Sequence, residues 1–221
     1  SSTEAGTINY GGSCSSSTTA STTDNNTITF NALSDATYSN CKISVTDNAS
    51  NTSDNLSVNS FTIDTVKPVI AQVTAVTTPT NDTTPGYDFS SDEAGTISYS
   101  GCSQGETSAI NGTNSISFGT LSEASYSCTI TVTDSAENAS SALSVSTFVV
   151  DTTAPTVDNV SSSTADGDYF PGDNITITVG FNETVNVDNS RGNPRIQLAT
   201  RSDNNSYANY VSGDNSNILS F

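Results

Sequence analysis

The feature that most constrains this chain is a long internal repeat. Residues 33–68 contain LSDATYSNCKISVTD, a polar turn and LSVNSFTIDTVKP, and residues 121–155 contain LSEASYSCTITVTD, a similar turn and LSVSTFVVDTTAP. Matched residues such as Asp47 and Asp134 lie 87 positions apart. The chain of 221 residues therefore holds between two and three units of this size, each long enough for one modest two-layer core.

Within each repeat, small or apolar residues alternate with polar ones, as in TITVTD. A period of two predicts half-buried strands, and the polar turn that follows TITVTD predicts a hairpin. The proline at the end of each repeat cannot donate to a sheet ladder, so it ends the last strand. Ser, Thr, Asn and Asp dominate the composition, which suits short strands and turns better than helices. We predict an all-β fold of tandem β-sandwiches with no significant helix.

The predicted domains are residues 1–66 (the first repeat), 67–153 (the second repeat) and 154–221 (the third segment). The second repeat is complete, whereas the first has no equivalent of residues 67–89. A sandwich without its first strands exposes its core and an unpaired edge. Two explanations stay open: the chain is cut from a longer protein, or a neighbour supplies the strand. The third segment lacks cysteine, and we expect a divergent β-domain truncated at its C-terminal end.

The chain is strongly acidic, with 23 Asp and Glu residues against 5 Lys and Arg and a net charge of −18. This balance disfavours nucleic-acid binding, which depends on cationic contacts to phosphate. Divalent cations are the natural counter-charge, although acidity can also simply keep an extracellular protein soluble. No apolar run approaches the ~20 residues that a spanning helix needs, so we expect no direct membrane insertion. The sequence has no signal peptide and starts inside a repeat, so we expect it to belong to something longer.

The cysteines fall as one pair in each repeat, Cys14 with Cys41 and Cys102 with Cys128. Such pairing favours structural disulfides and an oxidising compartment. A zinc site is a poor alternative, because two thiols without histidine do not complete a tetrahedral site. Each closed loop should contribute roughly 3–4 kcal/mol by chain-entropy arguments. Each disulfide should join two neighbouring strands of one sheet, near one end of that sheet.

Several motifs together resemble a known class of domains. The stretches TNDTTPGYDFSSDEAGTISY, LSEASYSC, VTDSAENAS and DTTAP resemble bacterial immunoglobulin-like (Big-type) repeats of large surface proteins and adhesins. The third segment, with STADGDYFPGDNITITVGFNETV, is similar to another bacterial Ig-like or cadherin-like domain. The resemblance implies Greek-key Ig-like sandwiches. Family members often have glycine before the Asn of the VTDxAxN turn, where this chain has Ser50 and Glu137, so these turns should be tight or strained.

Ig-like topology also predicts structural roles for aromatic and aliphatic residues. Tyr126 precedes Cys128 by two residues, as a tyrosine-corner residue does, and Tyr38 approximates that position. We expect each ring to be buried with its hydroxyl bonded to the backbone. The further core candidates are Phe30, Leu56, Phe61, Phe118, Leu143 and Phe148.

The same topology brings acidic residues together where domains join. The strand leaving one domain should direct its final Asp towards the top of the next, so Asp64 should approach Glu93, Asp134 and Asn138. By the same argument, Asp151 should approach Glu183, while Glu4 and Asp47 would await a linker from outside the sequence. Carboxylate and amide oxygens are ligands that Ca²⁺ prefers, so calcium is the expected ion. The alternative is that Asp134 and Asn138 cap their own turn and Glu93 is solvated.

Catalysis is not expected, because the chain has no histidine for a Ser-His-Asp or Cys-His arrangement and its cysteines are paired. The sequence favours a structural stalk or fibre segment of an extracellular bacterial surface protein, whose partners are neighbouring repeats of the same long chain or filament subunits. The alternatives are a glycan- or protein-binding module and a strand-exchanged filament. Asn-x-Ser/Thr sequons are numerous but arise by chance in this composition. Only Tyr169, Tyr207 and Tyr210 could form an aromatic platform for sugars, and the surface ligand is not predicted.

Overall fold

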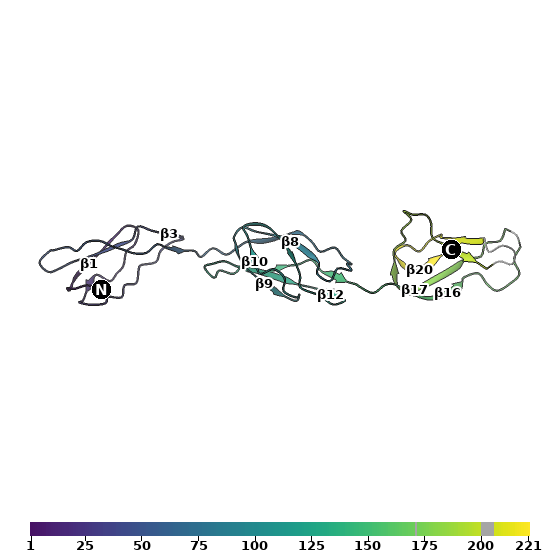
Figure 1. Ribbon diagram of the computed structural model, residues 1–221, viewed down its shortest axis with the longest axis horizontal. Coiled ribbons are helices and arrows are strands. Elements are labelled where there is room, and N and C mark those ends of the chain that lie inside the picture. The colour runs from purple at the N-terminus through teal and green to yellow at the C-terminus, as the bar shows by residue number, and fades with distance from the viewer. Residues whose placement is uncertain (171, 200–205) are drawn as a thin grey trace. The chain divides into compact units, whose positions relative to one another are not determined.

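The computed structural model describes residues 1–170, 172–199 and 206–221. Every regular element in this part of the chain is a β-strand, and none is a helix, as predicted (Figure 1). None of these residues forms a helix long and apolar enough to cross a membrane. Internal contacts divide the chain into two compact units, Ser1–Thr152 and Thr153–Phe221, which are described separately.

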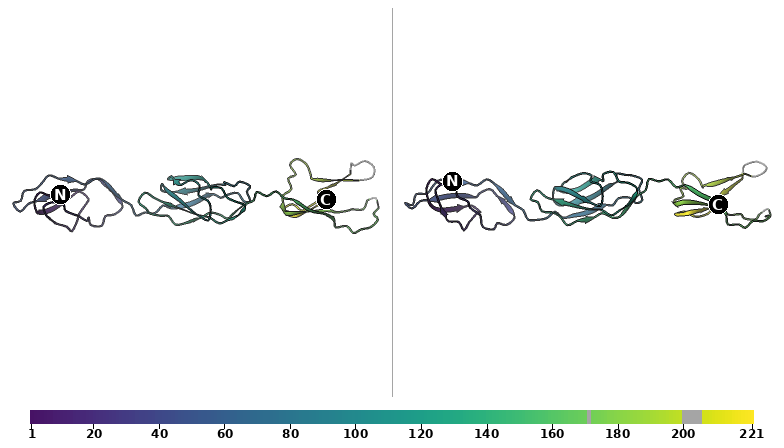
Figure 2. Two further views of the ribbon diagram at one scale, coloured as in Figure 1. Left: turned by 60° about the horizontal axis from the view of Figure 1, so that its bottom comes forward. Right: turned by 90° about the horizontal axis from the view of Figure 1, so that it is seen from below.

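The second repeat has the fullest set of strands, and further views show them running alongside one another (Figure 2). Three antiparallel sheets have the orders β10-β9-β13-β14, β11-β8-β7 and β12-β15. The strands are β7 (Ile70–Thr74), β8 (Gly86–Ser91), β9 (Gly95–Ser100), β10 (Ser108–Ala109), β11 (Gly112–Ser117), β12 (Ala124–Tyr126), β13 (Thr129–Thr133), β14 (Leu143–Ser144) and β15 (Phe148–Val150).

The core of the second repeat follows directly from strand alternation. Strand β8 buries Tyr87 and Phe89, and β13 buries Ile130 and Val132, while the residues between them are more exposed. These side chains join one apolar cluster that also contains Phe118, Phe148 and Val150. Burial of this continuous apolar surface between sheets is the main stabilising contribution to the second repeat.

The first repeat reproduces part of this arrangement, with sheets β2-β1-β4-β5 and β3-β6. Its strands are β1 (Gly6–Gly11), β2 (Ala20–Ser21), β3 (Ala36–Tyr38), β4 (Lys42–Thr46), β5 (Leu56–Ser57) and β6 (Phe61–Ile63). The buried cluster is small: Cys14, Tyr38 and Cys41, with Phe30, Leu33, Val58, Phe61 and Ile63 partly buried against it. The expectation that Leu56 belongs to the core is wrong, because Leu56 is 63% exposed.

Both predicted disulfides are present, Cys14–Cys41 and Cys102–Cys128, with Cα–Cα distances of 5.3 and 5.5 Å. Each lies just beyond the end of a ladder, β1 with β4 and β9 with β13, where Gly11 faces Lys42 and Ser100 faces Thr129. Each disulfide therefore links neighbouring strands of one sheet, as expected. Two such bonds are compatible with a secreted, non-cytoplasmic protein.

The two corner tyrosines bond to the backbone as predicted. The hydroxyl of Tyr126 donates to the carbonyl oxygen of Ser122, and that of Tyr38 donates to Ser34, both at 2.9 Å. Each ring stacks on a phenylalanine of the paired strand: Tyr126 on Phe148 at 5.5 Å and Tyr38 on Phe61 at 5.3 Å. The one-residue difference in spacing before the cysteine does not change this contact.

The third segment has an antiparallel sheet in the order β16-β17-β20 and a separate pair, β18-β19. Its strands are β16 (Val157–Ser162), β17 (Ile177–Val185), β18 (Arg195–Leu198), β19 (Ser206–Asn209) and β20 (Ser216–Ser220). Val179 and Leu219, which face each other in the ladder, are buried. Val160, opposite Val179 on the other side, remains 62% exposed, so the apolar face of this sheet is only partly covered.

Candidate metal centre between the first and second repeats

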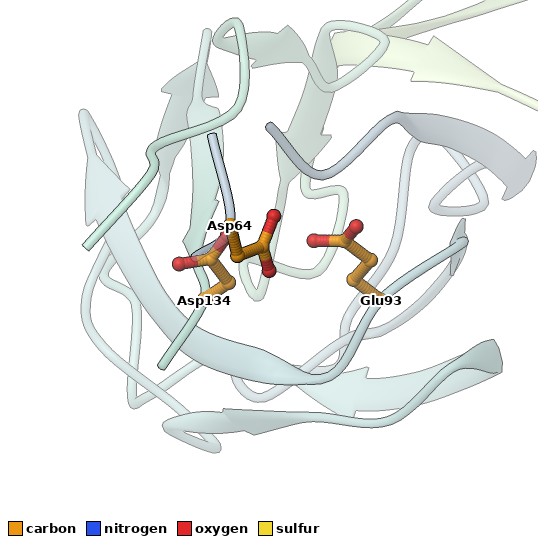
Figure 3. A group of neighbouring side chains, drawn as sticks. All are labelled: Asp64, Glu93 and Asp134. Carbon is orange, nitrogen blue, oxygen red and sulfur yellow. The ribbon is translucent and has the colours of Figure 1, made fainter. Parts of the chain in front are cut away.

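Three carboxylates converge within the first compact unit. One oxygen from each of Asp64, Glu93 and Asp134 lies within 4.8 Å of the others, and all three side chains are half-buried. Asp64 directly follows β6, Glu93 lies in the turn from β8 to β9, and Asp134 directly follows β13. The carboxyl groups point towards one another, with Asp64 between the other two (Figure 3). The predicted approach of Asp64 to the second repeat is therefore observed.

A glycine brings the Glu93 turn close to the Asp134 turn. Gly95 begins β9 opposite the end of β13, and an added Cβ there would lie 2.3 Å from the carbonyl oxygen of Thr133. No Cβ-bearing residue fits without a shift of this backbone. The close approach of β9 and β13 places Glu93, two residues before Gly95, beside Asp134, one residue after Thr133.

Asp134 organises its own turn. Its Oδ1 accepts hydrogen bonds from the backbone N–H of Ala136 (2.8 Å) and Asn138 (2.9 Å), and its Oδ2 accepts one from Asn138 Nδ2 (2.9 Å). Burial is the largest single influence on this carboxyl and raises its pKa, but the bonds from Asn138 and Ala136 together lower the pKa below the ordinary value. Asp134 is therefore held as a carboxylate.

The tight turn itself was expected from the residue before Asn138. Glu137 has a φ of 70°, and its counterpart Ser50 has a φ of 66°. This left-handed region favours glycine, because a Cβ there approaches the following carbonyl group. The Asx-turn function predicted for Asp134 and Asn138 is thus real, and it coexists with the carboxylate cluster.

Asn138 also fastens the linker to the second repeat. Its Nδ2 donates to the main-chain carbonyl oxygen of Asp64 at 3.1 Å, in addition to Asp134 Oδ2. Within the linker, the N–H of Val66 donates to Asp64 Oδ1 at 3.1 Å. In this arrangement Asn138 uses its amide nitrogen to position the two aspartates.

The other end of the linker is bound as well. The N–H of Val69 donates to Asp92 Oδ1 at 2.6 Å, and the N–H of Asp92 donates back to Val69 O at 3.2 Å. Thr65 donates to the carboxylate of Asp35 in the first repeat through its N–H (3.1 Å) and hydroxyl (3.0 Å). Pro68 is buried. The linker of residues 64–69 is therefore hydrogen-bonded to side chains of both repeats.

Glu93 is the least satisfied member of the cluster. Its backbone is fixed by Ser91, whose hydroxyl donates to Glu93 O at 2.6 Å. Its Oε2 is buried and has no hydrogen-bond partner in the described part of the chain. Burial, followed by the negative charges of Asp64, Asp134 and Asp92, raises the pKa of Glu93. An acceptor without a donor, facing two further carboxylates, has the chemistry of a cation ligand.

Asp92 was not singled out from the sequence. It contacts Val69 through its carboxylate and adds negative charge beside Glu93. The adjacent acidic pair Asp92-Glu93 in SSDEAG was the only available signal, and neighbouring residues in a turn do not reveal which of them faces the cluster.

The first repeat carries the corresponding acids. Asp47 accepts from Ala49 N–H, Asn51 N–H and Asn51 Nδ2 at 2.8, 2.8 and 2.9 Å, as Asp134 does in the second repeat. Bonds from Asn51 first, and then from Ala49 and the side chain of Glu4, lower the pKa of Asp47. Glu4 and Asp47 therefore lie together, as Glu93 and Asp134 do. Within the described ranges, the only cluster of three potential ligands is that of Asp64, Glu93 and Asp134.

Glu183 shares one property with Glu93. Its Oε1 is buried and lacks a hydrogen-bond partner among the residues that the structure describes. The neighbouring Asn182 is fixed by Thr156, whose N–H donates to Asn182 Oδ1 at 2.7 Å. Asp151 belongs to the first compact unit and Glu183 to the second, so their predicted approach stays a prediction.

The tyrosines considered for sugar binding have other contacts. The guanidinium carbon of Arg195 lies 4.0 Å from the ring centroid of Tyr207. Tyr210 accepts from Asp214 N–H at 2.9 Å and packs edge-on against Phe221. Tyr169 donates its hydroxyl to the carbonyl of Ala165. Tyr210 thus has a structural role, and Arg195 covers one face of Tyr207.

The chain was compared with protein families and with curated proteins. No protein-family model matches the chain, and no curated protein shows significant similarity to it.

Proposed function

We propose that this chain is an extender segment of an extracellular bacterial surface protein, built from Ig-like repeats, whose function is to hold other domains at a distance. The observation that carries this proposal is the anchored connection between the first two repeats. A flexible tether would need free backbone, whereas residues 64–69 are bonded to Asp35 on one side and to Asp92 and Asn138 on the other.

The composition supports a mechanical function rather than a chemical one. The disulfides resist opening of each repeat next to the β1–β4 and β9–β13 ladders. The chain is rich in Ser, Thr and Asn, whose polar side chains help to keep a long array soluble. The proposal follows the resemblance to surface-protein repeats, and the anchored linker supports it independently of that resemblance.

Calcium is proposed to stiffen the joint. Three carboxylates within 4.8 Å repel one another, and Glu93 Oε2 has no donor. A Ca²⁺ ion bound to Asp64, Glu93 and Asp134 would replace this repulsion with attraction and hold the linker residue Asp64 on the turns of the second repeat. Backbone carbonyls and water would supply the remaining ligands.

The extender function is tested by backbone ¹⁵N relaxation of the whole chain. Amides in β1 and β4 should report the same anisotropic tumbling as amides in β9 and β13, because a stiff joint makes the two repeats rotate as one body. Independent, faster tumbling of the first repeat, with and without calcium, would refute the stiff-joint argument.

The calcium proposal is tested separately by isothermal titration and thermal unfolding in calcium and in chelator. Calcium should bind at one site between the repeats and raise the unfolding temperature, and Asp64→Asn and Glu93→Gln should each weaken that binding at least tenfold. Asp158→Asn removes the same charge from exposed strand β16 and is the matched control. If chelator changes neither unfolding nor tumbling, the acids bind no calcium, although the extender function can still hold.

A further inference from the structure

Strands β18 and β19 form a two-stranded sheet with two chemically different faces. Arg195 pairs with Asn209 and Gln197 pairs with Tyr207, so these four side chains share one face, here called the β18–β19 platform. All four are exposed. The positions that alternate with them are half-buried: Ile196, Leu198, Ser206 and Ala208. Strand parity thus directs the platform away from the apolar side of the sheet, so packing against the apolar side leaves the platform in water.

Within the platform, the guanidinium group of Arg195 is held against an aromatic ring. Its central carbon lies 4.0 Å from the ring centroid of Tyr207, which is the diagonal neighbour of Arg195 across the strand pair. The attraction between the cation and the ring favours this one arrangement of both side chains. A guanidinium stacked in this way can still present the N–H groups of its planar edge to a carboxylate, through two parallel hydrogen bonds.

The platform is locally cationic, although acids outnumber bases 23 to 5 in the whole chain. Arg195 and the nearby Arg191 form no ion pair with any acidic side chain in the described ranges. Residues 189–199 and 206–213 contain these two arginines and no Asp or Glu. Acids farther away act weakly here, because the Debye length is about 8 Å at physiological ionic strength. The platform is therefore suited to a ligand that carries negative charge.

Asn209 adds a second kind of recognition group. It lies directly opposite Arg195 in the ladder, and its side-chain amide makes no hydrogen bond to other described residues. A side-chain amide can donate to one hydroxyl group and accept from another. Tyr207, which is 38% exposed, offers part of an aromatic ring to the C–H groups of a ligand. Together these groups match the carboxylate, the hydroxyls and the C–H surface of a sugar acid.

We propose that the β18–β19 platform is a binding site for an acidic polysaccharide built from hexuronic acids. Arg195 would hold a hexuronate carboxylate, Asn209 would bond to the neighbouring hydroxyls, and the exposed part of Tyr207 would contact the sugar ring. An open strand face suits a chain-like ligand, because the ligand can extend along it in both directions. This inference goes beyond the extender function and does not rest on it.

A polysaccharide fits this face better than the acidic surface of a second copy of the chain. A specific protein interface buries about 800 Å² on each partner, and its centre is apolar and closely packed. The platform has only four side chains, of which Tyr207 alone is aromatic. A sugar acid needs a much smaller contact, because one charged bond and a few hydrogen bonds to hydroxyls fix its position.

The test titrates a hexamer of galacturonic acid into the ¹⁵N-labelled whole chain. Chelator is present, so that calcium cannot bridge the carboxylates of the sugar to those of the protein. The hexamer should shift the amide signals of β18 and β19 and the side-chain Nε signal of Arg195, and it should leave the signals of β9 and β13 unchanged. The methyl ester of the same hexamer has the same sugars without the charge and should bind at least tenfold more weakly.

A matched pair of variants locates the site. Arg195→Gln should weaken binding at least tenfold, whereas Arg191→Gln removes the same charge outside the strand pair and should change binding less than twofold. Unchanged amide signals of β17 and β20 verify that each variant is folded. Absence of shifts at millimolar hexamer, equal binding of the hexamer and its ester, or an equal loss in the two variants would overturn the proposal. So would shifts of β18 and β19 that depend on protein concentration without sugar, because a second copy would then occupy the platform.

Discussion

Replacing one phenylalanine in each repeat measures how differently the two cores are closed. Phe148 and Phe61 occupy equivalent positions in β15 and β6, and each ring stacks on its corner tyrosine. Phe148 is 1% exposed and also stacks on Phe118 at 5.8 Å, whereas Phe61 is half-buried. The same substitution to alanine therefore probes two levels of burial in matching surroundings.

For Phe148→Ala we expect a loss of about 3–5 kcal/mol in the free energy of unfolding of the second repeat, because the transfer term and a closed cavity add together. For Phe61→Ala we expect a loss of roughly 1–2 kcal/mol in the free energy of unfolding of the first repeat, because the ring is already partly hydrated and its surroundings can relax. With a urea m-value of about 2 kcal/mol/M, the midpoint should fall by roughly 2 M for Phe148→Ala and by less than about 1 M for Phe61→Ala.

The assay is urea unfolding of the whole chain, followed by NMR. Amide signals of β13 report the unfolding of the second repeat and those of β4 report the unfolding of the first, so each repeat gives its own transition. The disulfides stay oxidised in both variants. Equal shifts for the two variants, or a larger shift for Phe61→Ala, would show that the first repeat is as well closed as the second and would refute the reasoning from burial.

Four further expectations concern single residues of the second repeat. In chelator at pH 7, Glu93→Gln should raise the urea midpoint of the second repeat, because a raised pKa means that stability falls as pH rises from the ordinary value through the native pKa of Glu93. Asp134→Asn should lower the midpoint, because a depressed pKa contributes stability that is lost as pH falls through the native pKa. A midpoint shift of the opposite sign in either variant would contradict the assignment for that residue. Tyr126→Phe should cost roughly 0.5–1.5 kcal/mol by removing the bond to Ser122, and an unchanged midpoint would mean that water replaces it. Glu137→Gly should stabilise by up to about 1 kcal/mol because φ is 70° there, and a destabilised variant in the same urea assay would show that the strain argument fails.

Local pattern was sufficient for much of the fold and part of the site. Strand alternation predicted the all-β class, because a residue's face in a strand depends only on its parity. Cysteine spacing predicted both disulfides, and the turn motif predicted the strained backbone at Ser50 and Glu137. The approach of Asp64 to Glu93 and Asp134 followed from the resemblance to Ig-like repeats, which implied where their loops meet.

The difference in burial between matched positions of the two repeats was decided by the tertiary structure. Leu56 and Leu143 match in sequence, yet Leu56 is 63% exposed while Leu143 packs against the core. Strand β7 contacts β14, the strand of Leu143, and residues 1–66 contain no counterpart of β7 beside Leu56. The unpartnered Oε2 of Glu93 and the linker bond of Asn138 are likewise long-range properties, because they depend on which groups three separate turns bring together. Near-identical repeats thus specify the same strands and turns, whereas the environment of each side chain depends on what packs against the repeat.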